Sequence, residues 1–264
     1  MEKRQREFLA IWGPPVPPEA GDTSRPDFEA QCKAMLDARP KVISSIMGLY
    51  PAEFVAELKA KGVLLFATAT TVAEAKAAEE AGADAIVAQG MEAGGHRGAF
   101  DPDRAEHQLV GLMALLPQVV DSVDVPVIAT GGIADARGIA AALILGASAV
   151  QMGTGLLRTP EAMTHPSYAD RIGRAEAHET TLTCAFSGRL GRSIATAYVR
   201  AALDGPLPAP TLFSADSPRS CGNRRAKLET LSGCKCGLDN PPNWLGQNPP
   251  ARLSSDCGTI LCNF

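Results

Sequence analysis

Short runs of apolar residues recur along the first two thirds of the chain and predict buried β-strands. Each run is bounded by glycine, proline or polar residues, which is typical of a strand buried on both faces. The first three runs begin about 21 residues apart, near the minimum for a strand, a three-turn helix and two connecting turns. The predicted strands cover residues 42–47, 63–67, 85–89, 125–129 and 149–152.

Alanine-rich amphipathic segments separate these strands and predict helices. Thr71 and Glu74 have the spacing of a capping box, and Asp135 is a second candidate N-cap. Another helix is expected over about 104–120, where Pro117 should end or kink it. The alternation of helices with strands that are apolar throughout predicts a parallel sheet covered by helices.

The predicted fold class is α/β, an incomplete (β/α)8 barrel of the TIM type. Five units are clear and Glu179–Phe186 is a sixth candidate strand, so five to six of the eight βα units are expected. Nothing before Val42 has the pattern of a βαβ unit. We therefore expect three segments: an irregular N-terminal segment over 1–40, the barrel portion over 41–206, and a tail over 207–264.

The composition changes in the tail. Serine, proline, asparagine and cysteine replace the alanine-rich pattern, and five of the seven cysteines lie in the last 44 residues. None of these cysteines forms a C-x-x-C pair and no histidine lies near them, so no metal site is expected. We expect the tail to be poorly ordered, and a small cysteine module is the alternative.

The overall composition is that of an ordinary globular protein. The formal net charge is −4 and the pI is near 5.6, so nucleic acid is not an expected partner. The longest apolar stretch, Ile139–Val150, is interrupted by Gly146 and is too short to span a membrane. The N-terminus lacks the apolar core of a signal peptide, and we expect a cytoplasmic protein.

Three glycine-rich loops follow three of the predicted strands. The first follows the strand that ends in Gln89, and it holds one histidine, His96. The second is Thr130–Ile133 and the third is Gln151–Gly155. In a parallel α/β fold such loops meet at the carboxyl ends of the strands, where backbone N–H groups bind phosphate without a basic side chain. Ordinary tight turns are the alternative, and the chain has neither a P-loop nor a GxGxxG motif.

The same loops carry a resemblance to a known family. VAQGMEAGGHRGAF, VPVIATGGIADARG and GASAVQMGTGLL resemble, in this order, the three core motifs of the nitronate monooxygenase family, formerly called 2-nitropropane dioxygenases. TLTCAFSGRLGR resembles the family's final-strand motif. The resemblance covers about residues 40–206. It implies a TIM barrel that binds FMN and uses O2 to oxidise alkyl nitronates or nitroalkanes to a carbonyl compound and nitrite.

The resemblance also implies roles for individual residues. His96, the histidine of the AGGH motif, corresponds to the family's catalytic base. Gln89 and Gly94 correspond to residues that contact the flavin. The residues that correspond to the FMN phosphate site are Gly131, Gly132, Gln151, Met152, Gly153 and Thr154. The expected partners are a small nitronate or nitroalkane substrate and O2, an oligomer is compatible with the family, and neither nucleic acid nor a membrane is expected.

The sequence departs from the family pattern at both ends. The family's barrel begins with a strand ending in Ala-Pro-Met, which is not found before Val42, and the tail from Thr211 does not match the family's C-terminal helix. We therefore expect a family member that is truncated at its N-terminus and altered in its C-terminal tail. Glu92 and Arg97 flank the predicted site and are expected to be solvated, although Arg97 could attract an anionic substrate.

Two other functions stay open from the sequence. One is a flavin-dependent NAD(P)H oxidoreductase of the enoyl-ACP reductase II type, whose AGGH loop is similar. The other is an inactive remnant that does not hold flavin stably. Retention of a flavin would separate the remnant from both enzymes, and the response to NADH would separate the enzymes from each other.

Overall fold

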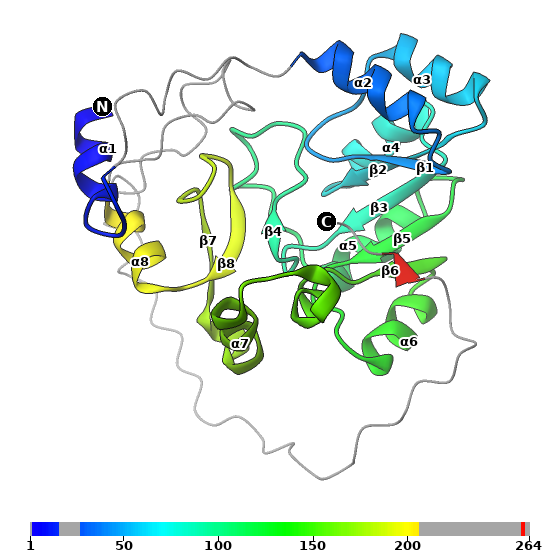
Figure 1. Cartoon of the computed structure of the whole chain (residues 1–264). Helices are drawn as coiled ribbons and strands as arrows, with labels where there is room; N and C mark the ends of the chain where they lie inside the picture. The colour runs from blue at the N-terminus through cyan, green and yellow to red at the C-terminus, as the bar shows by residue number, and fades with distance from the viewer. Residues whose placement is uncertain (1, 16–26, 206–259, 262–264) are drawn as a thin grey trace.

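All five predicted strands form, and they lie in one parallel sheet (Figure 1). The computed structural model describes residues 2–15, 27–205 and 260–261 of the chain. Most neighbouring strands are parallel and connected through helices, as the sequence predicts. In spatial order the strands are β1 (Val42–Ser45), β2 (Leu64–Ala69), β3 (Ala85–Gln89), β5 (Val127–Thr130), β6 (Ala149–Gln151) and β9 (Ile260–Leu261).

Each of the five body strands presents alternate residues to opposite faces of the sheet. On one face, Ile86 and Val127 lie in the main hydrophobic core beneath the helices. On the other face, Val87 and Ile128 form a smaller cluster against Phe66. Helices outside and a packed inner face are the arrangement of a TIM-type barrel. The described strands do not close into a full circle, so the predicted incomplete α/β barrel is confirmed.

Four helices cover the outer face of this sheet. Leu58 of the first helix, and Leu115 and Leu116 of the third, are almost completely removed from solvent, which makes these helices integral to the core. Burial of such side chains supplies about 1.5–3 kcal/mol each. The four helices are α3 (Ala52–Ala60), α4 (Val72–Glu80), α5 (Leu112–Val120) and α6 (Ala136–Ile144).

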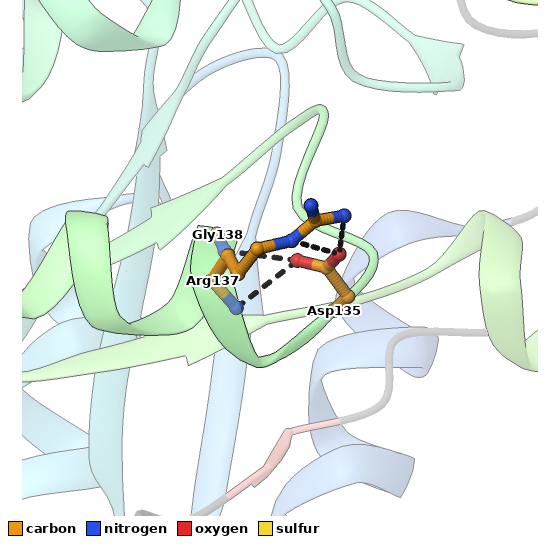
Figure 2. A network of polar contacts seen from close by, with 3 residues as sticks. All are labelled: Asp135, Arg137 and Gly138. Atoms are coloured by element: carbon orange, nitrogen blue, oxygen red, sulfur yellow. Dashed lines mark hydrogen bonds and ion pairs between the residues drawn. The ribbon is translucent and has the colours of Figure 1, made fainter. Parts of the chain in front are cut away.

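The predicted N-cap at Asp135 is confirmed (Figure 2). Its Oδ1 accepts hydrogen bonds from the backbone N–H groups of Arg137, at 3.1 Å, and Gly138, at 3.0 Å. These bonds satisfy two donors that the first turn of α6 leaves unpaired. The Arg137 guanidinium also contacts Asp135, but its side chain is 93% exposed, so this ion pair adds little to stability.

The helix expected over 104–120 is shorter than predicted. Helix α5 begins only at Leu112, after Gly111 as N-cap, and it runs through Pro117 to Val120. Its N-terminus has no capping side chain of its own. Instead, both carboxylate oxygens of Glu92 accept from the Leu112 N–H, at 3.0 and 3.1 Å. A cap supplied from 20 residues away leaves no local signal in the sequence, which explains the error in the predicted start.

The sixth predicted strand forms but belongs to a different sheet. β7 (Thr180–Thr183) pairs antiparallel with β8 (Gly191–Ile194), which in turn pairs antiparallel with β4 (Gly95–His96). A parallel neighbour would need a crossover connection, usually a helix. Here a short turn closed by the Gly188 N–H and the Cys184 carbonyl reverses the chain directly into β8. The prediction of β7 as a sixth parallel barrel strand was therefore wrong.

The described part of segment 1–40 contains two helices. The aromatic rings of Phe8 and Trp12 at the N-terminus pack against Tyr198, with centroid distances of 6.0 and 5.7 Å. The helices at the two ends of the body are α1 (Glu2–Leu9), α2 (Phe28–Asp37), α7 (Pro166–Arg174) and α8 (Ala197–Asp204). Three short 3-10 turns lie between them: Thr154–Arg158, Pro160–Ala162 and Ala177–Glu179.

Among the described residues, no helix has both the length and the hydropathy required to cross a bilayer. The expectation that 207–264 forms a poorly ordered tail lies outside the described residues, apart from Ile260 and Leu261. The backbone of these two residues pairs parallel with Val150 and Gln151 of β6. The three-segment division of the chain stays a prediction.

Candidate functional site

The three glycine-rich loops meet at the carboxyl edge of the parallel sheet. Gln89, Thr130 and Gln151 are the last residues of β3, β5 and β6, and they stand opposite one another in register. Two hydrogen bonds join the strand ends: the Gly90 N–H to the Thr130 carbonyl, at 3.0 Å, and the Thr130 hydroxyl to the Gln151 carbonyl, at 2.9 Å. The sequence thus places the three motifs along one continuous edge.

Glycine allows these loops to approach closely. A Cβ on Gly94 would overlap the side-chain hydroxyl of Thr154, so the first and third loops touch there. A Cβ on Gly131 would lie 3.0 Å from the backbone nitrogen of Ala93, so the first and second loops touch as well. Gly131 has a φ of +114° and Gly132 a φ of +70°, which disfavours residues with a side chain. The predicted glycines are therefore brought together by direct contact between loops.

The second and third loops retain free backbone donors. Within the described part of the chain, the N–H groups of Gly132, Gly153 and Thr154 donate to no protein acceptor. A Cβ built on Gly153 would meet nothing within 4 Å, so this backbone borders open space. Backbone N–H groups without a protein acceptor suit an anion such as phosphate. The flanking side chain of Met152 is half-buried.

His96 lies at the end of the first loop, in the two-residue strand β4. Its backbone pairs with Gly191, and its Nε2 forms a short hydrogen bond with the hydroxyl of Ser187. Figure 1 shows β4 between the parallel sheet and the β7–β8 hairpin. Partial burial lowers the pKa of the His96 imidazole below its ordinary value, and the positive charge of Arg189 lowers it further. The imidazole is therefore neutral at neutral pH and able to accept a proton.

Gln89 has a role that the sequence did not indicate. Its amide oxygen accepts from the Gly98 N–H, at 2.8 Å, and from the Arg97 guanidinium, at 3.1 Å. Its amide nitrogen donates to the His96 carbonyl, at 3.1 Å. The side chain thus organises the His96 loop, and its contact with a flavin stays a prediction.

Arg97 and Glu92 were both expected to be solvated, and for Arg97 this was wrong. Arg97 is only 3% exposed, and its guanidinium donates to the Gly90 carbonyl at 2.7 Å. The side chain folds inward and contacts residues at the start of the loop. Glu92 is exposed as a residue, but its carboxylate is occupied by the N-terminus of α5.

The sequence analysis also missed three polar residues around the loop. Ser187 holds the imidazole of His96, and it lies within the motif TLTCAFSGRLGR, which was the only signal for it. Arg192 donates to the Met91 carbonyl at 3.0 Å. The buried carboxylate of Glu74 accepts from the Phe100 N–H at 2.8 Å and from the Thr70 N–H at 2.7 Å. Only the Thr71 half of the expected capping box therefore forms, in which the Thr71 hydroxyl accepts from the Glu74 N–H.

This arrangement combines an anion-binding end with a proton-accepting end. The former consists of free N–H groups at the second and third loops, and the latter is His96. Among the described residues no group of three or more His, Cys, Asp or Glu side chains has the geometry of a metal site. The site can therefore hold a phosphate-bearing ligand and move a proton beside it.

Known proteins share these motifs and this fold. The chain matches the family described as nitronate monooxygenase over residues 16–218. It is 44% identical over 184 residues to the nitronate monooxygenase of Paraburkholderia phytofirmans, which covers 70% of this chain and 50% of that protein. Nitroalkane oxidase from Streptomyces ansochromogenes is 39% identical with a TM-score of 0.60, covering 70% of this chain and 54% of that one. FabK from Thermotoga maritima is 36% identical with a TM-score of 0.56, covering 70% and 53%.

The family match extends beyond the 40–206 region in which the motifs lie, at both of its ends. The chain spans about half the length of the first of these relatives. Agreement in motif order, sequence identity and fold, over more than half of this chain, leaves one conclusion. The chain belongs to the nitronate monooxygenase family.

Proposed function

We propose that this chain carries the cofactor and base sites of an FMN-dependent enzyme that oxidises nitronates or nitroalkanes with O2, forming a carbonyl compound and nitrite. The observation that carries the proposal is the contact between the three glycine-rich loops at one edge of the sheet, with His96 on the first of them. A site of this kind would bind a phosphate ester at one end and a small acidic substrate at the other.

The residues fit the phosphate end of FMN. Free N–H groups at Gly132, Gly153 and Thr154 would hold the phosphate. Gly94 packs closely against Thr154 beside them. Gly131, Gln151 and Met152 would complete this cradle. FMN, when bound, supplies the redox chemistry by taking electrons from the substrate and passing them to O2.

His96 would move the proton. A neutral nitroalkane must lose its α-proton before oxidation, and a neutral imidazole is the group that accepts it. The hydrogen bond between Nε2 and the Ser187 hydroxyl restrains the orientation of the ring. A nitronate arrives already deprotonated and would need His96 only for orientation.

The relatives support this proposal unequally. The curated relative is named a nitronate monooxygenase and one solved structure is a nitroalkane oxidase, at 44% and 39% identity. FabK, at 36% identity, supports the second candidate, a flavin-dependent NAD(P)H oxidoreductase of the enoyl-ACP reductase II type. The likeness to FabK covers the same share of this chain, 70%, as the likeness to the nitroalkane oxidase, so it does not by itself separate the two reactions.

One experiment separates the three functions. The purified full chain is mixed with FMN, freed of excess cofactor, and its visible absorption spectrum is recorded. A retained flavin spectrum with turnover of a primary nitronate and O2 consumption supports the proposal. Rapid anaerobic bleaching by NADH, without nitronate turnover, supports the oxidoreductase. Failure to retain flavin after reconstitution contradicts both and supports the inactive remnant.

A further inference from the structure

Arg97 is a buried cation directly after an exposed stretch of its loop. The residue is 3% exposed, whereas Gly94, Gly95 and His96 before it are exposed. Its Nε and NH2 atoms are buried and have no hydrogen-bond partner among the described residues. Burying two unbonded donors costs free energy, so stability alone does not explain an arginine at this position.

The bonded part of the guanidinium joins the two ends of the His96 loop. NH1 donates to the Gly90 carbonyl, at 2.7 Å, and to the Gln89 amide oxygen, at 3.1 Å. These two acceptors stand where the loop leaves β3, whereas Arg97 itself follows His96 at the other end. Gln89 closes the connection by accepting from the Gly98 N–H and donating to the His96 carbonyl.

The acceptors used by Arg97 do not depend on it. The Gly90 carbonyl also accepts from the Ala93 N–H, at 3.2 Å, and the Gln89 amide oxygen also accepts from the Gly98 N–H. Removing the guanidinium therefore leaves each of these two acceptors with a donor, and its remaining contact, to the Gln89 carbonyl, is long at 3.5 Å. An apolar side chain of similar length would fill the volume without burying a charge. The needs of the acceptors therefore do not explain the arginine, whose contacts join the two ends of the loop.

Glu74 and Glu92 are the two carboxylates whose charges act on Arg97. Burial lowers the pKa of the guanidinium, and the carboxylate of Glu74 acts in the opposite direction. That carboxylate also accepts from the Phe100 N–H, so it restrains the chain just beyond Arg97. Arg192, which faces the same loop, bonds to the Met91 carbonyl. Contacts from several elements therefore converge on residues 90–100.

We propose that Arg97 is a positioning residue for His96: together with Gln89 it fastens the start of the loop to its end and so fixes where the imidazole stands. This rests on the proposed function of His96 as the base. The competing explanation is that contacts with residues 187–190 alone position His96. These contacts are the hydrogen bond from the Arg97 N–H to the Leu190 carbonyl and the one between His96 and Ser187. In that case the guanidinium is dispensable for the loop.

The test uses the full chain with Arg97→Met, Arg97→Lys and the exposed-arginine control Arg137→Met. Amide hydrogen exchange at Gly98 and NMR titration of the His96 ring report loop order without any turnover. We expect Arg97→Met to unfold thermally within a few degrees of the parent, yet to exchange the Gly98 amide about tenfold to a hundredfold faster, the worth of one hydrogen bond to a charged group. The His96 titration should move towards that of a solvated histidine. Arg97→Lys should restore part of both, and Arg137→Met should change neither.

Turnover gives a second readout. With a neutral nitroalkane, kcat of Arg97→Met should fall about tenfold or more while KM changes less, because a displaced base affects the proton transfer more than binding. If the parent shows no turnover, the proposed function fails, and the exchange and titration data still decide the role of Arg97.

Two results would overturn the proposal. One is a folded Arg97→Met with unchanged Gly98 exchange and an unchanged His96 titration. That result would show that the contacts with Ser187 and Leu190 are enough to position His96. The other is an equal loss of thermal stability in Arg97→Met and Arg97→Lys, which would make the role merely structural. If Arg97→Met does not fold, Gln89→Leu removes the other half of the connection and must loosen the Gly98 amide in the same way.

Discussion

The hydroxyl of Thr154 occupies the space that a Cβ on Gly94 would need, so the loop after β3 rests directly on the loop after β6. This contact lies between the two motifs that the family resemblance assigns to different parts of the flavin. The first loop packs directly against the third, and position 94 has no room for a side chain. The relationship also gives a direct test of the site's architecture.

Gly94→Ala should destabilise the fold by about 1–3 kcal/mol, the usual cost of overpacking. Thr154 is short and β-branched, so it cannot turn away freely. The double variant with Thr154→Ala should recover most of the loss in a thermal unfolding experiment. Gly153→Ala is the matched control, since a Cβ there meets nothing within 4 Å. Full stability of Gly94→Ala, or no recovery in the double variant, would contradict the contact.

Gly132 and Gly62 form a second matched pair. Their φ angles are +70° and +68°, so an alanine at either pays the same left-handed penalty of about 1–2 kcal/mol. A Cβ on Gly62 meets open space, whereas one on Gly132 lies 3.2 Å from the Cβ of Glu92. We expect Gly132→Ala to lose somewhat more stability than Gly62→Ala because the contact with Glu92 must relax, and only Gly132→Ala to weaken FMN binding, by about tenfold, or 1.4 kcal/mol. Equal FMN titration curves for the two variants would show that Gly132 does not hold the phosphate.

The strands and their direction could be predicted from the sequence because they depend on local pattern. A strand buried on both faces must be apolar throughout, and Ile86-Val87-Ala88 shows that directly. The contacts between the glycine-rich loops could also be anticipated, since each loop follows a predicted strand, and the φ of +114° at Gly131 strongly favours glycine there. That the three loops meet at the carboxyl ends of the strands then follows from the parallel topology alone.

The parts that failed depend on partners distant in sequence. Nothing near Thr180 shows that β7 pairs with β8 instead of joining the parallel sheet. Nothing near Leu112 shows that Glu92 caps its helix. Arg97 was expected in solvent because arginine usually is. Its contacts with Gln89 and Gly90 depend on the turn of the loop, which no local pattern shows.

The lowered pKa of His96 predicts how activity depends on pH. Turnover of a neutral nitroalkane needs the neutral imidazole, so it should persist below pH 6.5 and fall only through the lower pKa of the folded protein. Arg189→Met removes one cause of the lowering and should move the inflection upward. The check is the pH profile of kcat/KM, with Arg137→Met as control. An inflection at or above 6.5, or one that Arg189→Met leaves in place, would contradict it.

The same shift links stability to pH. The folded protein binds fewer protons at His96 than the unfolded chain does between the folded pKa and 6.5. The contribution of His96 to the free energy of unfolding is therefore full above 6.5 and is lost as pH falls through this window. His96→Gln should flatten that part of the curve, measured by denaturant unfolding at a series of pH values.

His96→Ala separates proton transfer from substrate orientation. The variant should bind FMN nearly as well as the parent, because the phosphate would be anchored at Gly132, Gly153 and Thr154. Turnover of a neutral nitroalkane should fall by roughly 10²–10⁴, the usual contribution of a positioned base. A preformed nitronate needs no deprotonation, so its turnover should fall much less unless the imidazole also binds the anion. Equal losses with both substrates would assign His96 to anion binding, and unchanged rates with both would show that the family's base is not at this position.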